Sequence, residues 1–229
     1  MLITDFARHV TQWAPGAPSA SVAQAILDAA KQFLTETQVW NEVQQPIPLQ
    51  ANVQTYDMDA PIGARCIAIK DIYAPYLSTG RLRGVTLDEL ARMMPNWQTA
   101  QASGNDLGPQ SGSPSIYTRA FDFTTFNLYP MPVAPLPTTN GYLQVHGVYT
   151  LLDSATSIPD DVVERYREAI VLGARARLQA MPAQTWTNER QAADAAQQFK
   201  THIFRARVDA LHAKTNGNTA VTPRVFGRW

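Results

Sequence analysis

The stretch from Tyr149 to Trp186 constrains the fold more than any other part of this sequence. It reads YTLLDSATSIPDDVVERYREAIVLGARARLQAMPAQTW, which predicts the end of a strand, a polar break, a capped amphipathic helix closed by Pro182, and a turn into a second long helix. The segments before this stretch carry mainly strand patterns, and those after it carry mainly helix patterns. One chain of 229 residues therefore joins a β-rich part to a helical part.

Three long helices are predicted, at about 21–37, 159–181 and 188–214. Ser21 and Gln24 fit a capping box at the start of the first helix. Residues 11–20 contain two prolines and a glycine and favour an irregular entry to it. Each helix has a buried face of mainly apolar or small residues at helical spacing. These faces are Val22, Ile26, Ala29 and Phe33 in the first helix, Val163, Tyr166, Ile170, Gly173 and Arg177, widened by Val162, Ala169 and Leu172, in the second, and Ala192, Ala196, Phe199, Ile203, Ala206 and Ala210 in the third.

The middle of the chain predicts strands. The extended, alternating or continuous apolar segments are 46–49, 53–58, 64–72, 116–121, 124–129 and 142–149, and the run at 64–72 is long enough for a central strand. A short helix is expected at 86–93, with Thr86 as its N-cap and Glu89 completing a capping box. The residues of 98–115 are rich in Ser, Gly and Pro and indicate a loop within the sheet region.

Together these patterns predict an α+β fold, in which an antiparallel helical bundle carries an inserted β-sheet or β-sandwich module. The bundle is expected to comprise residues 1–45 and 153–215, which hold the N-terminal helix and the two long C-terminal helices. The β-rich module is expected at 46–152, with the short helix near 86–94. Residues 216–229 are expected to form an extended C-terminal tail.

Charge and composition argue against several classes of protein. The formal net charge is zero, whereas a protein that holds nucleic acid or an anionic membrane through bulk charge is basic. Residues 182–229 carry a net charge of +4 and the rest of the chain −4. This basic end suits docking on an acidic surface, or it complements the negative end of the last helix. No apolar stretch is long enough to span a bilayer, and the N-terminus is not expected to be a secretory signal.

No residue pattern predicts catalysis, a cofactor or a metal site, so we expect a structural protein and not an enzyme. The four histidines lie in unrelated segments, and the single cysteine, Cys66, is expected to be a buried small hydrophobe. Asp160 and Asp161 indicate a helix N-terminus more than an acid–base pair. A group of aromatic residues on the later strands could stack nucleic-acid bases, but such a stripe more often forms sheet core. This group is Tyr117, Phe121, Phe123, Phe126 and Tyr129.

Four segments and a final alanine-rich helix occur in a distinctive order. The segments are FLTETQVW at 33–40, NVQTYDMDAPIGARCIAI at 52–69, SPSIYTRAFDFTTFNLYPMP at 113–132 and GVYTLLDSATSIPDDVVERYREAIVLGARARL at 147–178. In this order they resemble the head-to-tail adaptor (connector) proteins of tailed bacteriophages, with the tail tubular protein A type as the most similar. The likeness covers about residues 19–212, and a long polar N-terminus and an aromatic last residue depart from it.

The resemblance implies a structural virion protein that forms a dodecameric homo-oligomeric ring in the neck, between the portal protein and the tail nozzle protein. The ring would be assembled in the host cytoplasm. Its lumen would carry double-stranded DNA during genome ejection without binding it specifically, and it would need no cofactor and no membrane. Two other functions stay open. One is a hexameric stopper or neck protein, and the other is a β-rich receptor- or carbohydrate-binding virion module with an aromatic groove.

The basic helix end and the C-terminal tail are the candidate portal-docking residues. Aromatic side chains with arginine beside them make good interface anchors, although such a tail could instead fold back over its own helices. The candidate residues are Arg205, Arg207, Lys214, Arg224, Val225, Phe226, Arg228 and Trp229. The loops of the β module would then face the tail nozzle.

Overall fold

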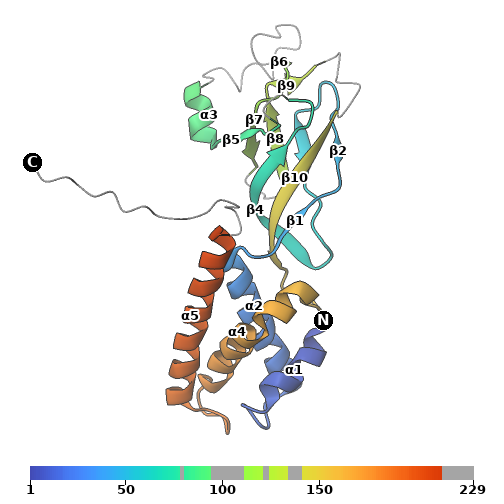
Figure 1. The fold of residues 1–229 in the computed structure, drawn as a ribbon. Helices are drawn as coiled ribbons and strands as arrows, with labels where there is room; N and C mark the ends of the chain where they lie inside the picture. Colours follow the sequence, from blue (N-terminus) through green and yellow to red (C-terminus); the bar gives the residue numbers. More distant parts are fainter. Residues whose placement is uncertain (78–79, 94–110, 121–123, 134–140, 213–229) are drawn as a thin grey trace, which may run out of the picture.

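The structure is a computed structural model that describes residues 1–77, 80–93, 111–120, 124–133 and 141–212. Within these residues it contains five helices and two four-stranded sheets with a small two-stranded one, which confirms the predicted mixed α+β class. Figure 1 shows four of the helices gathered at one end of an elongated molecule and the strands at the other. The predicted loop at 98–115 and the C-terminal tail lie largely outside the described residues.

The N-terminal residues form a helix that sequence patterns did not predict. Helix α1 spans Ile3–Thr11 and buries Ile3, Phe6 and Val10. Its start is held by the N-terminal amine, which donates a hydrogen bond to the Ile158 carbonyl at 2.8 Å and forms an ion pair with Asp160. The predicted irregular entry at 11–20 lies largely between α1 and α2, and residues 3–11, for which no helix was predicted, pack against the helices that follow.

Helix α2 spans Ser19–Thr37, and its predicted apolar face is confirmed. Val22, Ile26, Ala29 and Phe33 are all fully buried. The predicted capping box is wrong, since the helix begins two residues before Ser21 and no side chain caps it. Gln24 instead donates a hydrogen bond to the Asp28 carboxylate, one turn further along the helix, at 2.9 Å.

Helices α4 (Asp160–Gln179) and α5 (Glu189–His212) pack on α2 and on each other, as their predicted faces require. Gly173 of α4 lies at the point of closest approach. A Cβ added there would lie 2.9 Å from the Phe199 ring and 3.0 Å from the Ala29 Cβ. The small residue thus lets all three helices meet closely, a contact that fixes where α5 lies.

The first four-stranded sheet is built around β10 (Tyr142–Leu151). Strand β4 (Ala64–Tyr73) pairs antiparallel with one side of β10, and β1 (Asn41–Val43) and β2 (Ile47–Pro48) pair with its other side. Along most of its length β4 has no other strand partner within the described residues, so the prediction of a central strand at 64–72 is wrong. Side chains on both faces of β4 are partly covered, which explains its apolar run. Covered faces do not require that a neighbouring strand pairs with each edge.

The second sheet has the strand order β3-β8-β7-β5. In that order the strands are β3 (Thr55–Asp57), β8 (Thr125–Tyr129), β7 (Ile116–Arg119) and β5 (Arg83–Gly84). A separate small sheet pairs β6 (Ser111–Gly112) with β9 (Met131–Pro132). Helix α3 spans Leu87–Met93, and the Glu89 amide donates to the Thr86 hydroxyl at 3.2 Å, which confirms Thr86 as its N-cap. The other half of the predicted capping box does not form, because the Glu89 carboxylate accepts from Arg83.

One hydrophobic core runs from the helices into both sheets. It includes Phe6 and Ile26 from the helices, Leu143 from β10 and Phe126 from β8, each fully buried. Arg119 of β7 also links the sheets, because its guanidinium donates to the carbonyls of Cys66 and Ile67 on β4. The helical and β-rich parts therefore share a core.

Candidate interaction surfaces

The basic half of α5 carries two of the predicted portal-docking residues. Arg205 is exposed, but Arg207 donates two hydrogen bonds, at 3.1 and 2.9 Å, to the Glu36 carbonyl at the end of α2. Arg207 thus satisfies a helix C-terminus, a structural role that the sequence pattern did not reveal. Phe204, which directly precedes Arg205 in the sequence, is 67% exposed on the outer surface of the helix. The other candidates, Lys214 and those at 224–229, lie outside the described residues.

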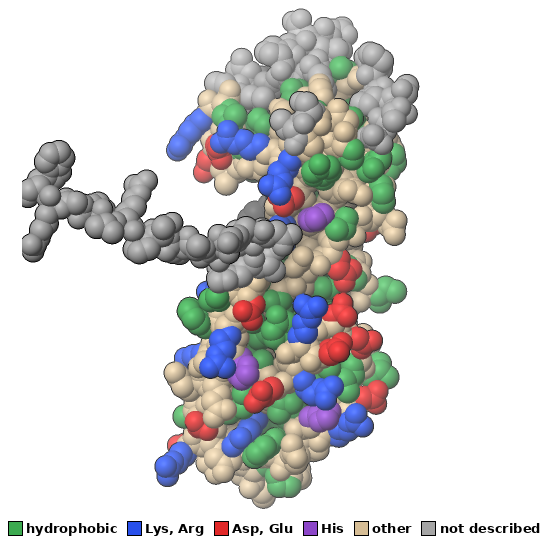
Figure 2. Space-filling model, viewed as in Figure 1, with side chains coloured by type: hydrophobic (Ala, Val, Ile, Leu, Met, Phe, Trp, Pro, Cys, Tyr) green, Lys and Arg blue, Asp and Glu red, His purple; other side chains and the backbone are tan. Residues whose placement is uncertain are grey.

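A second surface surrounds the turn between β3 and β4. The Ile62 side chain is fully exposed at the tip of this turn, where Gly63 adopts a positive φ of 77°. Beside it lies a groove of about 600 Å³, which we call the turn groove. Its apolar lining is formed by Met58, Ala60, Ala64, Cys66, Ile67 and Leu152. Figure 2 shows hydrophobic side chains projecting from both edges of the molecule.

Cys66 of the turn groove is buried, as predicted, and burial raises the pKa of its thiol. A raised pKa keeps the thiol protonated at neutral pH and therefore a weak nucleophile. The groove is thus an apolar binding surface without a reactive group among its described lining residues.

A third surface is a groove of about 570 Å³ between α1 and α4. The Arg175 guanidinium lies 4.1 Å from the Trp13 ring at one end, and His9 lies in the same groove. Partial desolvation, with Arg8 and Arg167 nearby, lowers the pKa of His9. The lining carries Glu164 and Glu168 as well as Arg165, Arg167 and Arg175, so the groove has no single charge that would select one class of ligand.

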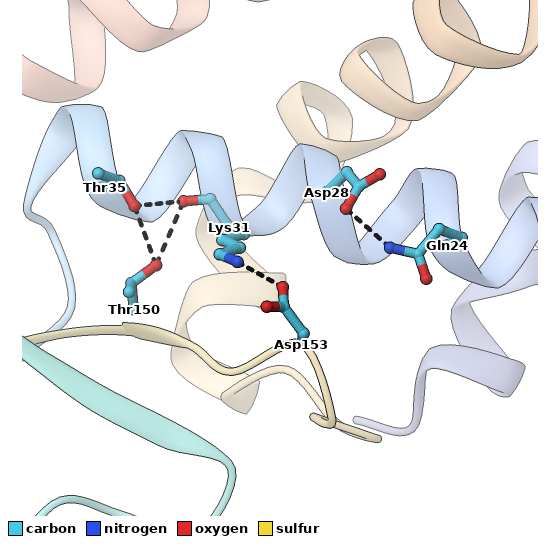
Figure 3. Close-up of polar contacts among 6 residues, drawn as sticks. All are labelled: Gln24, Asp28, Lys31, Thr35, Thr150 and Asp153. Carbon is cyan, nitrogen blue, oxygen red and sulfur yellow. Dashed lines mark hydrogen bonds and ion pairs between the residues drawn. The ribbon is translucent and has the colours of Figure 1, made fainter.

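Polar contacts join the helical part to the β-rich part where β10 passes α2 (Figure 3). The Lys31 ammonium pairs with the Asp153 carboxylate. The Thr35 and Thr150 hydroxyls lie 3.1 Å apart, and both donate to the Lys31 carbonyl. Next to these contacts the ring centroids of Trp40 and Tyr149 lie 5.7 Å apart. This junction holds the surfaces of the two parts in a fixed relation.

The Lys31–Asp153 pair gives a pH-dependent prediction. The hydrogen bond and charge of Lys31 lower the pKa of Asp153 below its ordinary value. Any stability from the pair is present above the ordinary pKa and is lost as the pH falls through the lowered one. In Lys31→Met we expect the carboxyl resonance of Asp153 to titrate at a higher pH than in the unmodified chain. Lys70→Met serves as the control, and an unchanged Asp153 titration in Lys31→Met would show that the pair does not form in solution.

The aromatic residues predicted as sheet core are buried where they are described. Tyr117, Phe126 and Tyr129 are at most 8% exposed, and Phe121 and Phe123 lie outside the described residues. Within the described chain no group of three or more His, Cys, Asp or Glu side chains could hold a metal ion. In the same residues, none of the helices has the length and apolar character needed to cross a membrane.

Comparison with known proteins gives one family. The model of the family described as SU10 adaptor protein matches residues 1–224. This match includes α1, which the sequence resemblance over 19–212 had left out. No curated protein matches the chain.

Proposed function

This chain belongs to the SU10 adaptor protein family, a family of phage structural adaptors, and from that premise we propose that it forms the head-to-tail adaptor ring of a virion. The observation that carries the proposal is the match over almost the whole chain, helices and strands together. In the proposed function, twelve copies of the tail tubular protein A type stand between the portal protein and the tail nozzle protein. The residues of 1–45 and 153–215 act as the helical bundle, and those of 46–152 act as the inserted β module.

The charge of the chain supports a conduit for double-stranded DNA. Each phosphate contact adds affinity that salt weakens, and many such contacts would slow the passage of DNA through a channel. A chain of zero net charge, with an acidic body, provides few of them. The proposal therefore includes no specific DNA binding, no cofactor and no catalytic step.

The junction between α2 and β10 supports a role in transmitting force between the two ends of the subunit. A ring that joins two other structures needs a rigid subunit, so that surfaces at its two ends keep their relative positions. Here Lys31 and Thr35 on α2 are tied to Asp153 and Thr150, and the hydrophobic core continues across the same boundary. We propose that the helical end faces the portal and that the β loops face the nozzle.

Native mass spectrometry of the purified chain, alone and mixed with the portal protein of the same virus, tests this function. We expect a closed ring of twelve copies that binds the portal. A mass of six copies would favour the stopper or neck protein, and a monomer or trimer in both samples would contradict the proposal. Electron microscopy of the same samples checks that the oligomer is hollow.

Deletion of residues 217–229 tests whether the C-terminal tail contributes to portal docking. We expect the shortened chain to form rings but to bind the portal at least tenfold more weakly, because the basic and aromatic anchors Arg224, Phe226 and Trp229 are removed. Binding is measured by co-sedimentation of the ring with the portal. Unchanged portal binding by the shortened ring would remove the tail from the proposed interface.

A further inference from the structure

Two exposed apolar features lie on opposite sides of the molecule. Phe204 projects from α5, and Ile62 stands beside the turn groove. Figure 1 shows α5 along one side and the turn between β3 and β4 on the other, with the C-terminal half of α5 near the level of that turn. Phe204 and Ile62 are the two most exposed large apolar side chains of the described residues, and an exposed apolar side chain together with an apolar groove supplies the apolar area that a protein–protein contact buries.

A closed ring uses two different surfaces of each subunit. In a head-to-tail contact the first surface of one copy meets the second surface of the next, and the rotation between them closes the ring. Two such surfaces must be complementary in shape and must lie on opposite sides of the subunit. A projecting aromatic ring on α5 and an apolar groove on the opposite side of the subunit meet both conditions.

The charges around the two surfaces are also complementary. From Phe199 to His212, α5 carries Lys200, Arg205 and Arg207 against a single acid, Asp209, a net charge of +2. Next to the lining residues of the turn groove in the sequence, Asp57, Asp59 and Asp153 stand against Arg65 and against Lys31, which pairs with Asp153, a net charge of −1. In Figure 2 the densest group of acidic side chains lies at the right edge, opposite α5. Opposite charges around an apolar contact favour the pairing of these two different surfaces over a contact between the same surface on two copies.

The geometry points to a contact between neighbouring copies of the chain, in which the Phe204 ring of one copy enters the turn groove of the next. This inference rests on the ring of the proposed function and specifies which surfaces close it. The groove suits an aromatic ring because its lining is mostly apolar and its rim carries Arg65, whose charge can lie against a ring face. Ile62 then packs on the outer surface of α5 beside Phe204.

Cross-linking through engineered cysteines tests the contact directly. In a Cys66→Ala background, Phe204→Cys is combined with Leu152→Cys, which lies on the rim of the turn groove. The protein is oxidised alone and with the portal protein, and is then separated by denaturing gel without reductant. We expect a ladder of multimers that ends at the closed ring for the double variant. A mixture of the two single variants can link each copy only once, so we expect dimers and no ladder.

The control moves the cysteine of α5 to Gln198, which is exposed on the same helix but about 120° around it from Phe204. Gln198→Cys with Leu152→Cys should give no ladder. If this control forms the same ladder, or if the Phe204 pair stays monomeric on the gel while rings are seen by microscopy, the proposed contact is wrong.

A second experiment uses Phe204→Asp and compares ring formation by native mass spectrometry. We expect at least a tenfold loss of ring at equal concentration with an unchanged thermal unfolding midpoint of the subunit, and we expect Gln198→Asp to form rings normally. Rings at the unmodified level in Phe204→Asp would overturn the contact and leave the adaptor function standing. Absence of rings from the unmodified chain, with and without portal, would overturn both.

Discussion

Replacing Phe33 with alanine is expected to lower the free energy of unfolding by about 3–5 kcal/mol, the usual cost of removing a large buried aromatic side chain. Phe33 is fully buried where α2, α4 and α5 meet. Its ring centroid lies 5.0 Å from that of Tyr166 and 6.4 Å from that of Phe199. Alanine would leave a cavity where the three helices meet, and the Tyr166 and Phe199 rings would each lose a packing partner.

Urea unfolding of the monomeric subunit at low concentration measures this loss. Since a domain of ordinary stability has about 5–15 kcal/mol in total, Phe33→Ala should shift the midpoint strongly while the slope stays the same. Phe204→Ala is the matched control, because the same side chain is removed from an exposed position on α5. We expect it to change the free energy of unfolding by less than about 0.5 kcal/mol. Equal losses in the two variants would contradict the packing described here.

The helical faces could be predicted because helical spacing is a local property of the sequence. Val22, Ile26 and Phe33 repeat every three or four residues, and all are buried. Helix α1 is too short to show such a repeat over several turns. Only Ile3, Phe6 and Val10 mark its buried face, and the contacts of its first residues to Ile158 and Asp160 join positions far apart in the chain. A nine-residue helix of this kind depends on tertiary packing more than on its own propensity.

Strand pairing and surface shape required the three-dimensional structure. The apolar run of β4 does not reveal whether one edge or both edges are paired, and within the described residues β10 takes the central position instead. The basic residues of α5 were identified from the sequence, yet nothing local shows that Arg207 reaches the end of α2 while Arg205 stays exposed. The turn groove likewise combines residues from the turn between β3 and β4, from β4 itself, from Thr124 just before β8 and from the segment after β10. Surfaces of this kind arise from distant segments, so no single motif predicts them.

Replacing Gly173 with leucine is expected to destabilise the subunit by about 3 kcal/mol, near the upper end of the usual cost of overpacking a core. Even a methyl group at this position would lie 2.9 Å from the Phe199 ring and 3.0 Å from Ala29, closer than ordinary carbon contacts. The gain in helix propensity on losing a glycine, about 1 kcal/mol, is smaller than this clash. Thermal unfolding followed by circular dichroism measures the change. Ala193→Leu, at an exposed position on α5, should unfold like the unmodified chain.

The Gly173 substitution also connects core packing to assembly. A larger side chain displaces α5, whose Phe199 ring it meets first, and it also presses on Ala29 of α2. Phe204 lies little more than one turn further along the same helix, so it would move with α5 relative to the turn groove. We therefore expect Gly173→Leu to lose rings at a temperature where most of the subunit is still folded. Phe33→Ala removes side-chain volume and does not push α5 outward, so it should lose rings only as the subunit unfolds. Native mass spectrometry across a temperature series separates these outcomes, and rings that persist in Gly173→Leu up to its unfolding midpoint would show that the position of α5 does not control the contact.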